Sequence, residues 1–565
     1  MQAQVLESMK NVEIWDRVTQ AVAAGPTVFI DAALATSDTM LAELLVKEWS
    51  GNSALVTANS APPFDHALRV ANKRITSSGT EFHRVSDPTH LALGLLRISS
   101  TPEVVRELLS ARSYVESLNV PFDSVGLLTL VLVRSNIPLM AVESVGISAR
   151  VGGDAETQIP AVDSQNPKKL LLAKATRAND GFYSTFVLRK FSRLLTQVAI
   201  AQRWTPNAIT WASMAVTVGA AVLFAQGSHR ALMIGAALVQ LAIIVDCSDG
   251  EVARYTNASS QYGAWLDAAT DRVKEYLLYA ALAVGAARHG TNLWPIAMVL
   301  VVMQTVRHLS DYNFVAIRAM RENADLSLPL TQSVDDISGS GSRLLTTSSR
   351  LNSRRLVHWI KRVIYLPIGE RWLIISVGAF VGSPSLVFNL LLWLGLFGLA
   401  YVTLGRFMRS RRWRHTQDIS GCDILERQFD AGPLLSSTLN RGHPLAGRFG
   451  WAVPSFLRLI ELGLVVLIGY SEPLAFITLF AIAFHHYDTM YRSLEGNVFP
   501  AALTKAGLGF EGRMLVLLVL FGQFHAPLHD TLALIGGYLF AVLVIRSSIT
   551  WAREIRAPRT ARAKG

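Results

Sequence analysis

The sequence predicts an α-helical, multi-pass membrane protein with about ten spans and a soluble α/β domain at its N-terminus. Hydrophobic residues make up 51% of the 565 residues and the mean hydropathy is +0.32, as expected of a chain that lies partly in a membrane. Apolar segments recur from residue 206 onward, whereas the first 165 residues alternate short β-type runs with helix-like segments. A chain of this length is also too long for one domain.

Residues 1–165 are expected to form the soluble domain. The predicted strands lie at Thr27–Ile30, Ala54–Thr57 and about His90–Ile98. A helix should begin after Thr101, which can cap it, with Pro102 in the first turn. Alternating strands and helices predict a layered parallel sheet.

No phosphate-binding glycine loop of the GxGxxG or GxxxxGK[ST] type occurs in this domain, so its residues do not support a catalytic role. We expect a turn at Val151–Asp154. The first sixteen residues lack the apolar stretch of a secretory signal, which predicts a cytoplasmic domain.

Residues 166–204 form a basic, amphipathic linker. Arg189, Lys190 and Arg193 alternate with phenylalanines and leucines. We expect a juxtamembrane helix on the membrane surface with its cations toward lipid headgroups. A linker helix packed on the N-terminal domain is the alternative.

Ten apolar segments follow, each close to the roughly 20 residues that cross a bilayer. We place them near residues 206–226, 230–250, 263–287, 292–314, 368–384, 385–405, 450–470, 472–491, 511–526 and 529–549. Residues 323–353, rich in Ser, Gly and Thr, are expected to be a flexible cytoplasmic loop, and residues 411–449 a cytoplasmic linker. The four spans within 450–565 have no predicted role.

The net charge of +11 is concentrated in segments that flank the apolar stretches, such as 406–414 and the C-terminal tail. The positive-inside rule then predicts cytoplasmic termini in a cell membrane, and the basic segments favour contact with membrane lipids. No basic segment is interleaved with aromatic residues, so we expect no nucleic-acid partner. The two cysteines, Cys247 and Cys422, do not suggest a disulfide framework.

Four aspartates, Asp246, Asp249, Asp267 and Asp271, stand in this apolar context. Carboxylates in or beside membrane helices are expensive to bury and therefore indicate function. Residues three or four apart share a helix face, so the acids form two faces on neighbouring helices. Such an oxygen-rich cage suits two Mg²⁺ or Mn²⁺ ions at the cytoplasmic side.

The residues around the acids suit a diphosphate substrate. Gly250 and Ala253 leave room for close approach, and Arg254 can pair with phosphate oxygens. Asp271, the last of the series, is the candidate general base for an attacking hydroxyl. A transporter or channel with an acidic cation site is the alternative, although such sites usually lie near the membrane centre.

The spacing from Asp246 to Asp271, with Gly250, Ala253, Arg254 and Gly263 between them, resembles the signature of the CDP-alcohol phosphatidyltransferases. The resemblance covers about residues 180–405 and implies a six-helix core, which we place at 205–410. It implies that Asp246, Asp249 and Asp267 hold two metals and that Asp271 contributes to the second and acts as base. The nucleotide contacts that it implies are Pro206, Asn207, Gly250, Ala253, Arg254, Ser260 and Gly263.

The implied reaction is attack of an alcohol on the β-phosphorus of a CDP-linked donor, CDP-diacylglycerol or a CDP-polyol, with release of CMP. The products would be phospholipids or polyol phosphodiesters. A bacterial cell membrane and a homodimer are further expectations. The overall layout, with Asp180-Gly181-Phe182 before the core, is similar to bifunctional inositol-phosphate cytidylyltransferase/di-inositol-phosphate phosphate synthases. Because the nucleotidyltransferase loop is absent, the N-terminal domain is expected to be a degenerate relative that serves regulation or docking.

Three arginines are candidates for binding the acceptor. Arg371, within Glu370-Arg371-Trp372-Leu-Ile-Ile, resembles a stretch of actinobacterial phosphatidylinositol-phosphate synthases. Arg307 and Arg318 are the others, and for all three a helix-end arginine at the membrane interface is the alternative. The Tyr-x-Lys-Ala-Arg pattern associated with inositol phosphate is not reproduced in residues 308–320.

His485 and His486 lie at the cytoplasmic end of a C-terminal span. Because adjacent helical residues point to different faces, we expect interfacial hydrogen bonding there rather than a substrate, partner or metal site.

Overall fold

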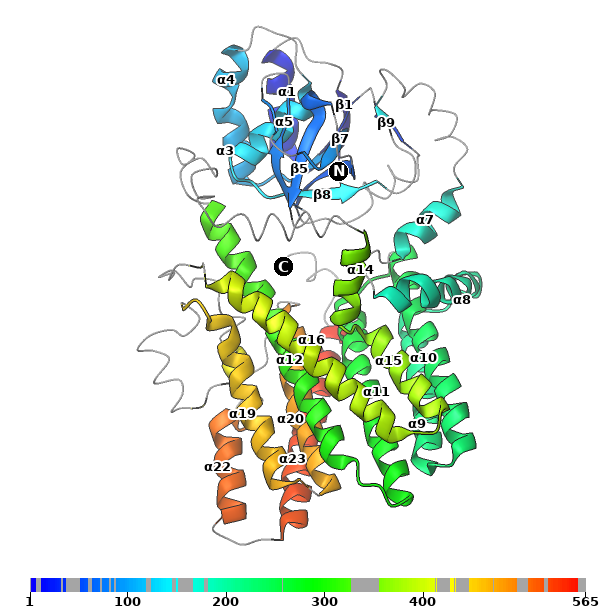
Figure 1. Ribbon diagram of the computed structural model, residues 1–565. Coiled ribbons are helices and arrows are strands. Elements are labelled where there is room, and N and C mark those ends of the chain that lie inside the picture. Colours follow the sequence, from blue (N-terminus) through cyan, green and yellow to red (C-terminus); the bar gives the residue numbers. More distant parts are fainter. Residues whose placement is uncertain are drawn as a thin grey trace. The chain divides into compact units, whose positions relative to one another are not determined.

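The computed structural model describes residues 2–36, 51–150, 166–326, 355–413, 427–432, 447–494 and 507–556, some of these ranges with short gaps. The chain divides into two compact units, one built on residues 1–176 and the other on residues 177–324 and 338–565 (Figure 1). The predicted turn at Val151–Asp154 and most of the predicted loop at 323–353 lie outside the described residues.

The N-terminal unit contains a sheet with helices between its strands. Its strands are β1 Gln2–Leu6, β2 Thr27–Asp31, β3 Leu34–Ala35, β4 Asn52–Ala58, β5 Ala67–Ala71, β6 Arg74–Ser78, β7 His90–Ile98, β8 Leu139–Glu143 and β9 Ala149–Arg150. Its helices are α1 Val12–Ala24, α3 Pro102–Ser110, α4 Arg112–Ser117, α5 Ser124–Arg134 and α7 Pro167–Ala175. The three predicted strands are confirmed as β2, β4 and β7, and Thr101 caps α3 by accepting from the Val104 amide at 3.3 Å.

The prediction of a parallel sheet is wrong. The seven main strands follow the order β1-β2-β7-β4-β8-β6-β5, and only β1–β2 and β4–β8 are parallel. Strand β5 also pairs with β7, so five of the strands form a closed ring. Only two residues separate β5 from β6, which permits a hairpin but not the long crossover of a parallel pair. Helix α1 packs on the core through Trp15, whose indole donates to the Leu108 carbonyl at 3.0 Å.

The second unit is helical. Its first helices are α8 Arg189–Ala201, α9 Pro206–Gln226, α10 His229–Tyr255, α11 Gln261–Arg288 and α12 Trp294–Leu326. They are followed by α14 Arg355–Ile364, α15 Ile368–Phe380, α16 Pro384–Ser410, α19 Val453–Ile468, α20 Pro473–Leu494, α22 Gly509–Gly522 and α23 Leu528–Arg556. Hydroxyl side chains cap α9, α10 and α11 at Thr205, Ser228 and Ser260. Gly227 ends α9 at a φ of 75°, a conformation that favours glycine.

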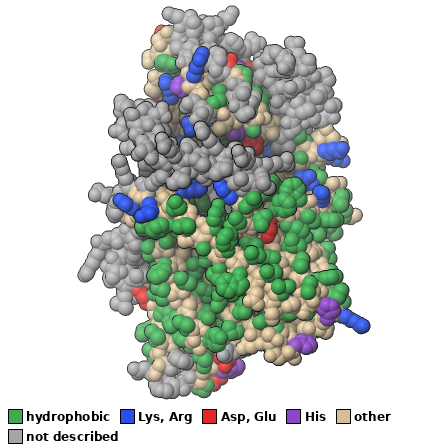
Figure 2. All heavy atoms as spheres, in the orientation of Figure 1, with side chains coloured by type: hydrophobic (Ala, Val, Ile, Leu, Met, Phe, Trp, Pro, Cys, Tyr) green, Lys and Arg blue, Asp and Glu red, His purple; other side chains and the backbone are tan. Residues whose placement is uncertain are grey.

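Among the described residues, five helices have the length and composition to cross a membrane. They are Pro206–Gln226, His229–Tyr255, Pro384–Ser410, Gly450–Ile468 and Leu528–Ile549. Large hydrophobic side chains such as Trp211, Trp393 and Leu467 face outward, and Figure 2 shows hydrophobic atoms spread over one face of these helices. The expected ten spans are not confirmed, because α15 and α22 have only 13 and 14 residues and α11 and α12 carry several charged residues.

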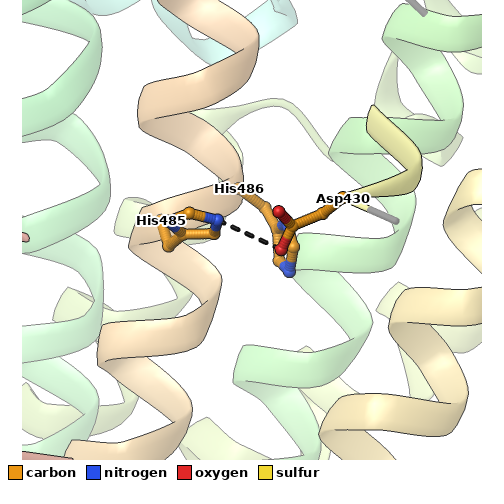
Figure 3. A group of neighbouring side chains, drawn as sticks. All are labelled: Asp430, His485 and His486. Atoms are coloured by element: carbon orange, nitrogen blue, oxygen red, sulfur yellow. Dashed lines mark hydrogen bonds and ion pairs between the residues drawn. The ribbon is translucent and has the colours of Figure 1, made fainter. Parts of the chain in front are cut away.

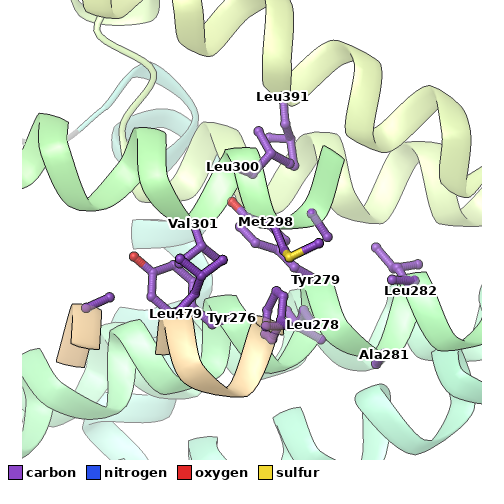
Figure 4. Close-up of a cluster of buried hydrophobic side chains, with 14 of the residues drawn as sticks. Tyr276, Leu278, Tyr279, Ala281, Leu282, Met298, Leu300, Val301, Leu391 and Leu479 are labelled. Atoms are coloured by element: carbon purple, nitrogen blue, oxygen red, sulfur yellow. The ribbon is translucent and has the colours of Figure 1, made fainter. Parts of the chain in front are cut away.

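The core of this unit lies where α11 meets α12, α16 and α20. Tyr276 and Tyr279 of α11 are buried among Val301, Leu391 and Leu479, one from each of these three helices (Figure 4). Helices α9 and α10 pack beside α11 (Figure 1). The helix that carries two of the candidate aspartates is therefore central in the unit.

The predicted juxtamembrane helix is α8, which packs on α10. Arg189 is buried and donates to Glu251 at 2.7 Å, so the expectation that this cation faces lipid headgroups is wrong. Ser192 and Thr196 donate to the same carboxylate at 2.9 and 2.7 Å. A buried carboxylate needs such partners, and their position fixes this face of α8 toward the protein. Lys190 and Arg193 are exposed, so the helix is amphipathic as predicted.

Candidate active site

Three of the four predicted aspartates converge. One carboxylate oxygen each of Asp246, from α10, and of Asp267 and Asp271, from α11, lie within 4.8 Å of one another. All three side chains are half-buried. Carboxylate oxygens are the ligands that Mg²⁺ and Mn²⁺ prefer, so this donor set fits such an ion.

Asp249 lies one helical turn after Asp246 and faces α9. It is buried, its Oδ2 accepts from the Thr210 hydroxyl at 2.5 Å, and its Oδ1 accepts from the Gly250 amide. The hydrogen bond to Thr210 joins the acidic end of α10 to the first turns of α9.

Lys274 is a site residue that sequence reasoning missed. Its side chain is fully buried, and its ammonium contacts Asp246 and lies 3.3 Å from Oδ1 of Asp271 and 3.3 Å from the Ser213 hydroxyl. The spacing could have found it, because position 274 follows Asp267 and Asp271 by seven and three residues and so shares their helix face. A buried cation here offsets part of the charge of the three carboxylates.

The predicted nucleotide-binding residues come from the ends of three helices. Pro206 and Asn207 occupy the first turn of α9, Ser260 and Gly263 begin α11, and Ala253 and Arg254 lie in the last turn of α10. A Cβ at residue 263 would lie 3.0 Å from the Ser260 hydroxyl and 3.1 Å from Asn207 Oδ1, so α9 and α11 begin close together. Two helix N-termini in one place favour a bound anion.

Gly250 makes room for an arginine. A Cβ at residue 250 would lie 3.0 Å from one guanidinium nitrogen of Arg254 and 3.4 Å from the other. The missing side chain therefore lets Arg254 lie along α10, beside the acidic cluster.

The three candidate acceptor arginines differ in their surroundings. Arg371 is buried and makes two hydrogen bonds to Glu275 of α11, at 2.6 and 3.0 Å, and one to the Leu366 carbonyl at 2.9 Å. Arg307 is also buried; it stacks on Tyr365 at 4.6 Å, and its Nη1 has no hydrogen-bond partner among the described residues. Arg318 is half-buried. Only Arg307 combines burial with an unsatisfied donor atom, which is a costly arrangement unless a ligand completes it.

A second group of possible metal ligands lies in the C-terminal region. The expectation that the two adjacent histidines cannot meet at one point is wrong: one nitrogen each of His485 and His486 lies within 4.8 Å of an Asp430 oxygen (Figure 3). The expected hydrogen bonding is confirmed for both histidines. Asp430 precedes α19 in the chain, and its carboxylate accepts from His485 at 3.2 Å and from Arg513 at 2.6 Å. Burial alone would raise the pKa of the Asp430 carboxyl, but Arg513 and His485 hold it well below its usual range.

Arginine side chains lie within hydrogen-bond distance of both histidines of this second group. Arg458 lies 2.8 Å from His486 Nε2 and donates to Glu461 at 2.7 Å, and Arg546 lies 3.0 Å from His485 Nδ1. Glu461 also accepts from Arg513 at 2.6 Å. Guanidinium groups in these positions repel a cation, and the contacts form a buried ion-pair network, which we call the C-terminal ion network.

The comparisons with known proteins bear on the acidic cluster. Residues 203–331 match the CDP-alcohol phosphatidyltransferase family. The chain contains a CDP-alcohol phosphatidyltransferase domain. This domain begins just before α9 and contains all four aspartates and Lys274. Residues 431–565 match a family of unknown function, DUF5941.

Curated relatives are similar to part of the chain. It is 38% identical over 131 residues to a bifunctional IPC transferase and DIPP synthase of Rubrobacter xylanophilus, covering 23% of this chain and 29% of the relative. It is 35% identical over 88 residues to a phosphatidylinositol phosphate synthase of Corynebacterium glutamicum, covering 16% of this chain and 39% of the relative. The chain therefore spans well under half the length of these relatives. Together with the five apolar helices, the domain indicates a membrane protein.

Proposed function

We propose that this protein transfers a substituted phosphate group from a CDP-linked donor to an alcohol acceptor and releases CMP. The observation that carries the proposal is the convergence of Asp246, Asp267 and Asp271 next to the adjoining N-termini of α9 and α11. An acidic cluster for divalent cations and a site for an anion thus lie side by side, as a diphosphate substrate requires.

The four aspartates are the proposed ligands of two Mg²⁺ or Mn²⁺ ions. Asp246, Asp267 and Asp271 offer oxygens within one ion's reach, and Asp249 follows on the same face of α10. Bound ions of this kind neutralise diphosphate charge and stabilise the leaving phosphate. Lys274 keeps Asp246 and Asp271 in place from the buried side of the cluster.

The donor's nucleotide and diphosphate are proposed to bind at the three helix ends. The backbone amides at the start of α9 and α11 favour the negative charge, and Pro206, Asn207, Ser260 and Gly263 line these turns. Arg254 can give two hydrogen bonds to one phosphate group. Gly250 and Ala253 have little or no side chain, which leaves space beside α10 for the diphosphate to approach the aspartates.

Asp271 is the proposed general base. Its carboxylate takes the proton of the acceptor hydroxyl, whose oxygen forms a bond to the β-phosphorus as the bond from that phosphorus to CMP breaks. Arg307 is the proposed acceptor contact, since its buried guanidinium has a donor atom to offer. The names of the relatives favour a phosphorylated polyol as acceptor, and a phosphate group would satisfy this arginine.

We further propose that the active site faces the cytoplasm of a bacterial cell, as the distribution of basic residues suggests. The test of the proposed function is to incubate the full chain, purified in lipid nanodiscs, with radiolabelled CDP-diacylglycerol, Mg²⁺ and a panel of polyols and polyol phosphates. Formation of CMP with a radiolabelled phosphodiester product supports the proposal. CDP-polyol donors form the second arm, and absence of CMP from every donor and acceptor would reject it.

A further inference from the structure

Helix α11 has two functional faces. Asp267, Asp271 and Lys274 occupy one face at spacings of four and three residues. Trp265, Ala269, Arg272 and Tyr276 occupy another face with spacings of four, three and four. Because successive helical residues are turned by about 100°, these two faces are on nearly opposite sides of the helix.

The second face of α11 packs on α20, which belongs to the C-terminal region 431–565. The Trp265 indole donates to Asp488 at 2.8 Å, and the Tyr276 and Tyr487 hydroxyls are 3.0 Å apart. Between these two contacts, Ala269 packs against Phe484. Trp265, at one end of this contact, is only two residues from Asp267.

The polar contacts between the two helices are buried and specific. Asp488 and Tyr487 are almost completely inaccessible, and Asp488 also accepts from Arg492 at 2.8 Å and from Ser547 at 3.2 Å. The Arg492 guanidinium lies 5.4 Å from the Trp265 ring centre. Hydrogen bonds of this kind fix the rotation of one helix against another, which apolar packing alone does less precisely.

Helix α20 is itself held from its other side. His485, His486 and Thr489 face the C-terminal ion network, where they contact Asp430, Glu461 and Arg546. These positions lie roughly opposite Phe484, Tyr487 and Asp488 on the helix. The ion network thus anchors α20, and α20 in turn supports α11.

We propose that the C-terminal region is an intramolecular support that sets the position of the aspartates on α11, with Trp265 and Tyr487 as positioning residues. This inference rests on the proposed function, because it assigns the supported carboxylates to metal binding. It gives a role to the region of unknown function: the region packs on the face of α11 opposite the aspartates and holds this helix in position.

The test uses Trp265→Phe and Tyr487→Phe in the full chain in nanodiscs. Each variant still has an aromatic ring and loses one hydrogen-bonding group; Trp265→Phe also replaces the indole by the smaller phenyl ring. Trp393→Phe and Tyr470→Phe make the same changes at exposed positions, with 67% and 60% of the residue accessible, and serve as matched controls. Mn²⁺ binding is measured by electron paramagnetic resonance, alongside the thermal unfolding midpoint and the kcat and KM for CDP-diacylglycerol.

We expect Mn²⁺ to bind about tenfold more weakly to each test variant, the low end of the effect of residues that orient metal ligands. The kcat of each test variant should fall, while its KM for the donor stays unchanged. The two control variants should match the wild type in Mn²⁺ binding, kcat and KM. If the test variants bind Mn²⁺ within about twofold of the wild type and only their unfolding midpoint is lower, the region merely stabilises the fold, and the inference is overturned. Because Mn²⁺ binding is read without turnover, a wild type that binds Mn²⁺ but releases no CMP would reject the proposed function separately.

Discussion

The Lys274 ammonium lies 3.3 Å from Oδ1 of Asp271, in a fully buried position behind the acidic cluster. It contacts Asp246 as well, so one internal cation serves both helices that carry the aspartates. Three carboxylates this close would repel one another strongly without a cation. Lys274 therefore balances part of the charge of the cluster, and the proposed divalent ions would balance more of it.

Replacing Lys274 by methionine should make the fold depend on divalent ions. Removing the buried ammonium leaves partly buried carboxylates without their partner, which lowers stability, and a bound ion can offset that loss. We expect Lys274→Met to unfold at a lower temperature in EDTA and to recover more than the wild type when Mg²⁺ is added. Lys190→Met, at an exposed position on α8, is the control. Equal Mg²⁺-induced shifts in variant and wild type would show that Lys274 does not balance the cluster.

Gly250→Ala should weaken donor binding. The added methyl group would lie 3.0 Å from a guanidinium nitrogen of Arg254, so that the guanidinium must shift by a few tenths of an ångström. Loss of one guanidinium–phosphate contact predicts a KM for the CDP-linked donor about tenfold higher, with a smaller change in kcat. Gly405→Ala, where no atom lies within 4 Å of the new Cβ, is the matched control. A donor KM equal to that of the control would exclude this role for Arg254.

Arg307 and Arg371 should give different defects. Arg307→Gln is expected to raise the KM for a phosphorylated acceptor about tenfold or more and to leave the donor KM unchanged. Arg371→Gln leaves Glu275 buried without its main partner and should cost about 3 kcal/mol of stability. Steady-state kinetics with each substrate varied in turn, together with thermal unfolding, separate the two. An Arg307→Gln variant with normal acceptor KM would contradict its assignment.

The C-terminal ion network should make the protein sensitive to acid. The pKa of Asp430 is depressed in the folded protein, so its contribution to stability is complete above the unfolded value of about 4 and is lost as the pH falls through the folded value. Asp430→Asn should lower the stability by about 3 kcal/mol at neutral pH and flatten the loss at low pH. Thermal unfolding between pH 7 and pH 3 measures both, with the exposed Asp530→Asn as control. An unchanged pH profile would mean that Asp430 is not the group that titrates.

The sequence predicted the positions that matter most but not their partners. The motif spacing located the aspartates and the small residues, because helical periodicity relates neighbours along one chain segment. The ion pair of Arg371 with Glu275 could not be predicted, because the two residues are 96 positions apart in the sequence. For the same reason the arrangement of His485 and His486 depends on Asp430, 55 residues distant, and could not be inferred from adjacent positions.

Strand direction shows the same limit. The strands β2, β4 and β7 were recognised from composition, but their antiparallel pairing is a property of the whole sheet. Lys274 differs, because its spacing from Asp271 was visible in the sequence. A lysine on an apolar helix has no fixed partner in the sequence, since Asp246, which it contacts, lies 28 residues away on another helix.

The central claim is that the aspartates on α10 and α11 bind divalent ions and that CMP release depends on these ions. The direct measurement is CMP release from CDP-diacylglycerol as a function of Mg²⁺ concentration, by wild type, Asp267→Asn, Asp271→Asn and the exposed control Asp530→Asn. We predict Mg²⁺-dependent release by wild type and control, and a loss of at least about 100-fold in both site variants while they still unfold cooperatively. Release by Asp267→Asn or Asp271→Asn at the wild-type rate, or release by the wild type that persists undiminished in EDTA, would contradict the claim.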